Sequence, residues 1–148
     1  MEAVNTYRVF DWLWTSGQLS AADVSALPGM GIEVVLNLAV PSSSYALPGE
    51  AELVTGLGLT YIHLPVAWEN PLPQQFFQFV GLLQALQGRK VWLHCALNMR
   101  VSAFVYLYRR LVLGEKETEA SFPMREIWAP NETWQEFMQQ VSGQFPPP

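Results

Sequence analysis

The only cysteine of the chain, Cys95, lies five positions before Arg100 in the stretch VWLHCALNMRVSAF (residues 91–104). Apolar residues predict a buried strand over 90–94 and a helix over 102–113. A turn between a strand and a helix N-terminus directs several backbone N–H groups at one point, and the helix dipole adds partial positive charge. Such a cradle binds oxyanions and favours the thiolate form of a cysteine. The stretch therefore predicts a nucleophile inside an anion-binding loop.

Arg100 supplies the positive charge that such a site needs. Its planar guanidinium can bind two oxygens of one phosphate, and a cation at a helix start indicates an anionic partner. Ser102 can hydrogen-bond the sulfur of Cys95, and His94 is expected to orient the loop from behind. The expected phosphate-binding residues are Ala96, Leu97, Asn98, Met99 and Arg100. Together these groups would stabilise the transition state of an attack by the thiolate.

Short apolar strands alternate with helices along the chain. Strands are predicted over residues 7–10, 32–38, 59–65 and 90–94, and helices over 20–27, 50–57, 74–87, 102–113 and 131–141. Ser20 and Asp23 predict a capped start for the first helix, and TSGQ before it predicts a turn. This alternation is typical of an α/β domain with a central, mostly parallel sheet flanked by helices. Ligands bind such sheets beyond the carboxyl ends of the strands, where Cys95 falls.

Size and composition limit the classes of function. With 148 residues, half of them apolar, the chain is expected to form a single domain, residues 1–148, with a substantial core. The net charge of −5 argues against nucleic acids and anionic membranes as partners, because both require a basic face. No cluster of His, Cys, Asp or Glu has metal-ligand spacing, and no nucleotide-binding motif occurs, so neither a metal nor another cofactor is expected.

The sequence also indicates a compartment. A single cysteine cannot form an internal disulfide, which fits a reducing environment. The N-terminal stretch MEAVNTYRVFDW lacks the basic start and apolar centre of a signal peptide. No apolar run reaches 18 residues, so no membrane span is expected. We therefore expect a cytoplasmic protein.

Three stretches resemble one known family. LHCALNMRVS is similar to the signature loop of cysteine-dependent protein tyrosine and dual-specificity phosphatases, which reads His-Cys, five residues, Arg, then Ser or Thr. TSGQLSAADVSALPGMGIEVVLNL resembles the opening of small bacterial dual-specificity-like phosphatases, and GLTYIHLPV resembles the strand before their general-acid loop. The resemblance covers roughly residues 8–113. It implies a dual-specificity-phosphatase-like fold, phosphorylated substrates and hydrolysis of phosphate monoesters through a cysteinyl-phosphate intermediate.

The signature loop departs from that family in its length. Only four residues separate Cys95 from Arg100, Asn98 stands in place of a glycine, and Ser102 follows the arginine by two positions. An ungapped alignment would put Val101 on the family's arginine, whereas a one-residue deletion puts Arg100 there; we favour the deletion. Asparagine tolerates the left-handed backbone that a tight turn needs. A shortened Cys-x4-Arg loop also resembles those of some bacterial phosphatase-like domains and of rhodanese-type sulfurtransferases.

The general acid is the second departure. The family supplies an aspartate shortly after the strand that ends in Pro-Val, but the two aspartates of this chain, Asp11 and Asp23, lie elsewhere. The loop over residues 65–70 offers Glu69, and a glutamate can protonate a leaving oxygen if its reach fits. The alternative is that Glu69 is a solvated loop carboxylate. His63, on a predicted strand, is expected to be structural.

Three functions remain open at this point. The first is a phosphatase that uses Cys95, Arg100 and Glu69. The second is a non-catalytic module of the same fold that binds a phosphorylated partner, and the third is a sulfurtransferase that carries a persulfide on Cys95. Residues 114–148 predict a charged loop and a terminal amphipathic helix, whose apolar face is expected to pack on the core. The alternative for that face is a contact in a homodimer.

Overall fold

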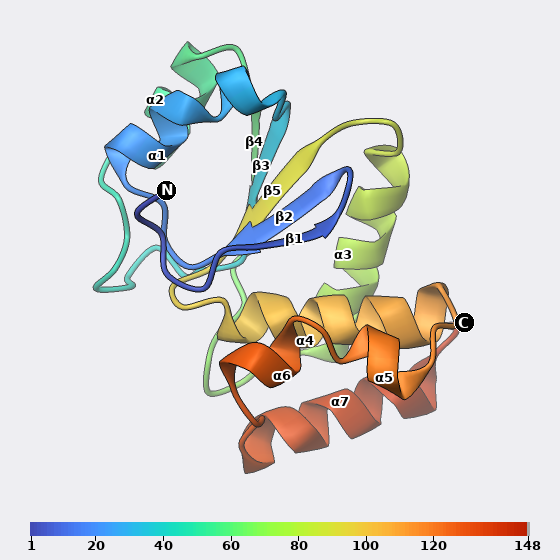
Figure 1. Ribbon diagram of the computed structural model, residues 1–148. Helices are drawn as coiled ribbons and strands as arrows, with labels where there is room; N and C mark the ends of the chain where they lie inside the picture. The colour runs from blue at the N-terminus through green and yellow to red at the C-terminus, as the bar shows by residue number, and fades with distance from the viewer. Residues whose placement is uncertain (148) are drawn as a thin grey trace.

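The computed structural model describes residues 1–147 and shows a five-stranded sheet with helices on both faces (Figure 1). The strands are β1 (Tyr7–Phe10), β2 (Leu13–Ser16), β3 (Val34–Asn37), β4 (Thr60–His63) and β5 (Val91–His94), and their order in the sheet is β1-β2-β5-β3-β4. β1 pairs with β2 antiparallel, and every other pair is parallel. The predicted α/β architecture with a mostly parallel sheet is confirmed.

The helices form two groups. They are α1 (Ala21–Ala26), α2 (Glu50–Gly56), α3 (Pro73–Ala85), α4 (Met99–Leu107), α5 (Glu117–Ala120), α6 (Met124–Ile127) and α7 (Glu132–Gln144), with a 3-10 turn at Pro28–Met30 and a π-helical turn at Tyr108–Val112 that continues α4. α1 and α2 cover one face of the sheet, and α3, α4 and α7 lie on the other side (Figure 1). Ser20 and Asp23 form the predicted capping box at the start of α1.

The central strand β5 separates two apolar cores. Because strand side chains alternate between faces, Trp92 joins the core beneath α1 and α2, whereas Val91 and Leu93 join the core beneath α3, α4 and α7. All four residues of β5 are buried, as expected for a parallel strand covered on both faces. Burial on both sides fixes the register of β5 and hence the position at which Cys95 leaves the sheet.

The C-terminal helix packs on the chain's own core. Trp134, Phe137 and Val141 are buried, and the Phe137 ring stacks on Phe104 of α4 with 5.6 Å between centroids. Asn131 caps the helix by accepting a hydrogen bond from the N–H of Trp134. The apolar face predicted there is therefore used for packing within the chain.

Three local predictions were wrong. β2 occupies residues where a turn was predicted, because Thr15 and Ser16 are polar yet buried, with hydrogen bonds from Asn98 and Trp92 respectively. The helix predicted from residue 102 begins at Met99, since the left-handed backbone of residue 98 turns the chain into the helix at once. The region between residues 114 and 130, predicted as a loop, contains α5 and α6. Among the described residues, no helix is both long and apolar enough to cross a bilayer.

Candidate functional site

Cys95 is the first residue after β5 and lies at the carboxyl edge of the sheet, between the ends of β2 and β3. Its side chain lines a pocket of about 130 Å³. The other residues that line this pocket are Trp68, Ala96, Leu97, Met99 and Arg100. The structure thus brings Cys95, Arg100 and three of the predicted phosphate-binding residues to one cavity, while Asn98 lies buried outside its lining.

The backbone between Cys95 and α4 presents free hydrogen-bond donors. Within residues 1–147, no carbonyl or side chain accepts a hydrogen bond from the N–H groups of residues 96–100. These amides precede or open α4, so the positive end of the helix dipole adds to them. Buried amides are normally paired. A row of unpaired ones at a pocket therefore favours an anionic ligand.

Arg100 has an unusual environment for a cation. It is 94% buried, since only 6% of its surface is exposed, and its Nη1 donates to the carbonyl oxygen of Val66 at 2.9 Å. The chain's other five arginines each lie within 4.0 Å of a carboxylate oxygen. Arg100 has no such ion pair in the described part of the chain. A buried guanidinium without a counterion is costly, which favours an anionic ligand at this pocket.

Asn98 does more than permit the turn. Its φ of 66° and ψ of 14° lie in the left-handed region, as the sequence predicted. Its Nδ2 donates to the carbonyl oxygen of Asn5 at 2.7 Å and to Oγ1 of Thr15 at 3.2 Å. In return, Nδ2 of Asn5 donates to the carbonyl oxygen of Leu97 at 2.9 Å. The N-terminal segment 2–6 is therefore joined to the Cys95 loop by exchanged amide contacts.

Gly17 allows the loop to approach β2 closely. The N–H of Gln18 donates to the carbonyl oxygen of Ala96 at 2.9 Å, and the N–H of Gly17 donates to Val4 at 2.8 Å. A Cβ at position 17 would lie 2.7 Å from the Ala96 oxygen and 2.8 Å from a methyl carbon of Val4. Only glycine fits between the N-terminal segment and the loop.

Replacing Asn98 separates its backbone role from its side-chain role. Asn98→Gly keeps the left-handed conformation but removes both Nδ2 hydrogen bonds, so we expect a loss of about 1–2 kcal/mol in the free energy of unfolding. Asn98→Ala should lose a further ~1–2 kcal/mol, because alanine is strained in that region. Urea denaturation measures both, with the exposed Asn70→Ala as control. Equal stability of the glycine and alanine variants would contradict the backbone argument.

His94 is held from behind by a residue that sequence reasoning missed. Its Nε2 lies 2.6 Å from Oε2 of Glu50, and its Nδ1 lies 3.1 Å from the carbonyl oxygen of Cys95. The Glu50 Oε1 accepts from Nε2 of Gln18 at 2.6 Å. Burial opposes ionisation of Glu50, but hydrogen bonds from His94 and Gln18 and the charge of His94 outweigh it, so the pKa of Glu50 is lowered. No local motif marks Glu50, because its partner is 44 positions away.

The Ser102 hydroxyl has partners other than Cys95, and Glu69 lies outside the pocket lining. The Ser102 hydroxyl donates to the carbonyl oxygen of Met99 at 2.9 Å and accepts from Nε1 of Trp128 at 3.0 Å, so it is engaged away from the sulfur. Glu69 is exposed and does not line the pocket. Its neighbour Trp68 does, and the Trp68 carbonyl accepts from Nε1 of Trp134 at 3.0 Å. A tryptophan cluster therefore anchors the loop that carries Glu69.

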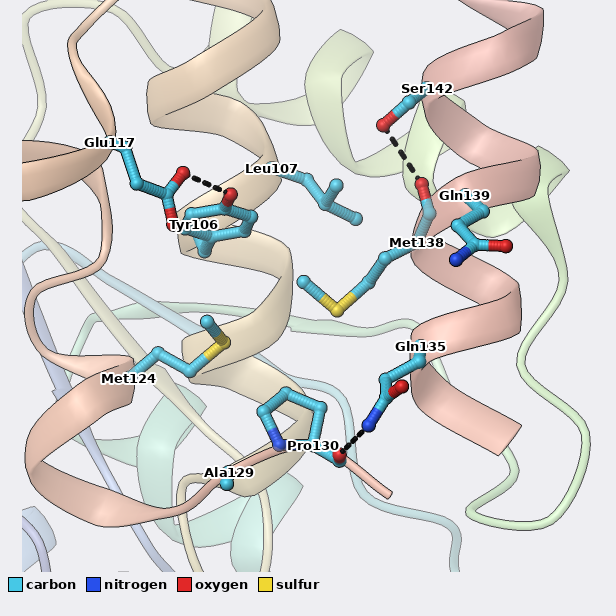
Figure 2. Close-up of a pocket in the computed structure, with 10 residues that line it drawn as sticks. All are labelled: Tyr106, Leu107, Glu117, Met124, Ala129, Pro130, Gln135, Met138, Gln139 and Ser142. Carbon is cyan, nitrogen blue, oxygen red and sulfur yellow. Dashed lines mark hydrogen bonds between the residues drawn. The ribbon is translucent and has the colours of Figure 1, made fainter. Parts of the chain in front are cut away.

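Other cavities lie outside the Cys95 loop, and one of about 380 Å³ has Glu50, Tyr61 and His63 on its walls. Another of about 600 Å³ lies between α4, α6 and α7, with Met124 and Met138 on its walls (Figure 2). Glu117, the carboxylate on its walls, accepts a hydrogen bond from the hydroxyl of Tyr106. His63, predicted to be structural, has its Nε2 2.6 Å from the carbonyl oxygen of Ala39. No group of three or more His, Cys, Asp and Glu residues able to hold a metal occurs within residues 1–147.

Solved structures include proteins similar to this chain. No family model and no curated protein matches the chain. Among solved structures, a candidate phosphatase (DUF442) from Shewanella putrefaciens CN-32 is 32% identical, covers 97% of this chain and 95% of its own length, and superposes with a TM-score of 0.85. The chain belongs to the DUF442 family.

More distant structures share the fold of this DUF442 protein. TpbA of P. aeruginosa is 20% identical over 95% of this chain and 88% of its own, with a TM-score of 0.74. PTPMT1, solved in complex with PI(5)P, is 14% identical over 94% and 95%, with a TM-score of 0.78. At these identities the likeness shows the fold alone, which is that of protein tyrosine phosphatase-like enzymes.

Proposed function

We propose that this DUF442 protein is a cysteine-based phosphatase acting on phosphate monoesters. The Cys95 thiolate attacks phosphorus in line, forming the S–P bond while the bond to the leaving oxygen breaks. The amides of residues 96–100 and the Arg100 guanidinium bind the equatorial oxygens. A general acid or water protonates the leaving oxygen, and water then cleaves the cysteinyl phosphate, which releases inorganic phosphate and restores the thiolate. No cofactor takes part.

One observation carries this proposal. The chain's only thiol and the buried Arg100 line a single pocket, and the N–H groups of the intervening turn, residues 96–100, have no partner within residues 1–147. Each feature alone has a structural explanation, but a tetrahedral oxyanion next to sulfur is what satisfies all three. This arrangement supports the alignment in which the loop is one residue shorter, Cys-x4-Arg, with Arg100 as the signature arginine.

The pocket walls favour an aryl phosphate as the test substrate. Trp68, Leu97 and Met99 give the cavity apolar sides on which an aromatic ring can pack. TpbA was solved in complex with pTyr and PTPMT1 in complex with PI(5)P, so two different phosphorylated ligands are bound by proteins of this fold. We propose phosphotyrosine or dual-specificity type activity, and steady-state hydrolysis of p-nitrophenyl phosphate by the purified wild-type protein is its first test.

Glu69 is the proposed general acid because it is the only carboxylate in the loop over residues 65–70. If it protonates the leaving oxygen, Glu69→Gln should slow phenyl phosphate hydrolysis about 10²-fold, while p-nitrophenyl phosphate, whose leaving group needs less protonation, should slow far less. Comparing kcat for the two substrates in wild type and variant measures this. An equal small effect on both substrates would assign the proton to water instead.

A non-catalytic phosphate-binding module is the second candidate. The exposure of Glu69 and its absence from the pocket lining favour it. Calorimetry with phosphate or vanadate, run beside the turnover assay, separates the two: binding without hydrolysis supports the module, and binding with hydrolysis supports the enzyme. A gain of one sulfur atom on Cys95 after incubation with thiosulfate, seen by mass spectrometry, would instead support sulfur transfer.

We also propose that residues 1–148 act as one domain in the cytoplasm. Both apolar cores share the strands of one sheet, so neither core is complete without the other half of the chain. Cys95 is a free thiol in the structure, and catalysis needs it reduced, as it is in a reducing compartment.

A further inference from the structure

Each ring nitrogen of His94 faces an oxygen atom, one from the Glu50 carboxyl group and one from the Cys95 carbonyl, and both oxygens only accept hydrogen bonds when Glu50 is ionised. Nε2 faces the Glu50 carboxylate at 2.6 Å, and Nδ1 faces the Cys95 carbonyl oxygen at 3.1 Å. A neutral imidazole has one donor nitrogen and can satisfy only one of these contacts, whereas the imidazolium donates from both. The side chain of His94 is fully buried and that of Glu50 is 6% exposed. The geometry therefore matches a buried imidazolium–carboxylate pair.

Glu50 is the centre of this arrangement. One carboxylate oxygen of Glu50 lies next to Nε2 of His94, and the other accepts a hydrogen bond from the side chain of Gln18. The backbone N–H of Gln18 in turn donates to the carbonyl oxygen of Ala96, within the Cys95 loop. The ionisable groups that face Glu50 are His94 from β5 and Tyr61 from β4; Glu52, on its own helix, acts on Tyr61 and lies exposed. The lowered pKa of Glu50 agrees with a carboxylate that stays ionised at neutral pH.

We propose that Glu50 is a positioning residue that keeps His94 doubly protonated behind Cys95 and so raises the thiolate reactivity of the nucleophile. The pair has its positive end toward Cys95, because the imidazolium contacts the Cys95 backbone while the carboxylate lies on the far side of the ring. A cation beside a cysteine favours the thiolate. This inference rests on the proposed role of Cys95 as nucleophile.

The test uses the fact that Cys95 is the chain's only cysteine. Alkylation by iodoacetamide, an uncharged reagent, then reports this one thiol without requiring any phosphatase turnover. Glu50→Gln keeps an amide oxygen for His94 but removes the charge. We expect the alkylation rate of this variant near neutral pH to fall about tenfold. Equivalently, its curve of alkylation rate against pH should move to higher pH by about one unit. The matched control is Glu52→Gln, which removes the same charge from the exposed face of α2.

Two outcomes of the alkylation test overturn the inference. One is a Glu50→Gln profile that coincides with wild type, and the other is an equal shift in Glu52→Gln. If Glu50→Gln does not fold, nitrogen NMR of the wild-type histidines decides instead: His94 must show two protonated ring nitrogens at neutral pH, and a neutral ring sinks the proposal. If the alkylation curve of Glu50→Gln shifts but the wild-type protein has no phosphatase turnover, the proposed function is wrong, while the effect of Glu50 on Cys95 through His94 is supported.

Discussion

Cys95→Ser protein is expected to lose hydrolysis of p-nitrophenyl phosphate by about 10⁴-fold or more, since a serine hydroxyl in this pocket has no base to activate it. Phosphate and vanadate binding should persist, because the amides of residues 96–100 and Arg100 are untouched. Steady-state kinetics and calorimetry on one preparation measure both properties. The substitution removes little volume, so the unfolding midpoint should stay near that of wild type.

Iodoacetamide provides the matching control for this prediction. Because the chain has one cysteine, alkylation of wild type should abolish turnover in step with the loss of the free thiol, and Cys95→Ser should not react. Turnover that survives in the serine variant or in fully alkylated protein would remove Cys95 from the mechanism.

Arg100→Ala is expected to lose both turnover and anion binding. Among the described residues that line the pocket, Arg100 is the only cationic one, and loss of one such preorganised donor costs about 10²–10³-fold in rate. Arg100→Lys should recover part of the binding but not the two-oxygen contact, so its kcat should stay low. Arg110→Ala, an exposed arginine on the continuation of the same helix, is the control and should behave as wild type.

Thermal unfolding gives Arg100 an independent test. Phosphate at 100 times its Kd should stabilise wild type by about 2.7 kcal/mol, and this gain should vanish in Arg100→Ala. Without phosphate, the alanine variant should be at least as stable as wild type, because it no longer buries an uncompensated cation. A large loss of stability in the anion-free variant would mean that Arg100 serves the fold through its contact with Val66.

The features that the sequence predicted correctly depend on residues that lie close together in the chain. β3 and β5 are apolar runs that can only be buried strands, and Cys95 and Arg100 meet because one turn joins them. The sequence did not predict β2, because its buried Thr15 and Ser16 are polar. Their hydrogen-bond donors are distant in the chain, at positions 98 and 92.

The missed parts of the site depend on distant contacts. Glu50 reaches His94 across 44 positions, and Asn5 reaches Leu97 across 92. Trp68 joins the pocket because tryptophans of the C-terminal region hold its loop, as its contact with Trp134 shows. No local pattern carries such information, since each contact exists only once the sheet has assembled.

The exchanged amides of Asn5 and Asn98 bear on how the protein can be shortened or tagged. A recombinant fragment that starts at β1 would keep every strand and helix, yet it would strip the carbonyl of Leu97 and the side chain of Asn98 of their partners. The N–H of Glu2 also donates to Asp23 at 2.7 Å, so an N-terminal fusion would sit close to α1. An N-terminal affinity tag is therefore best avoided, because the residues before β1 help to hold the Cys95 loop in place.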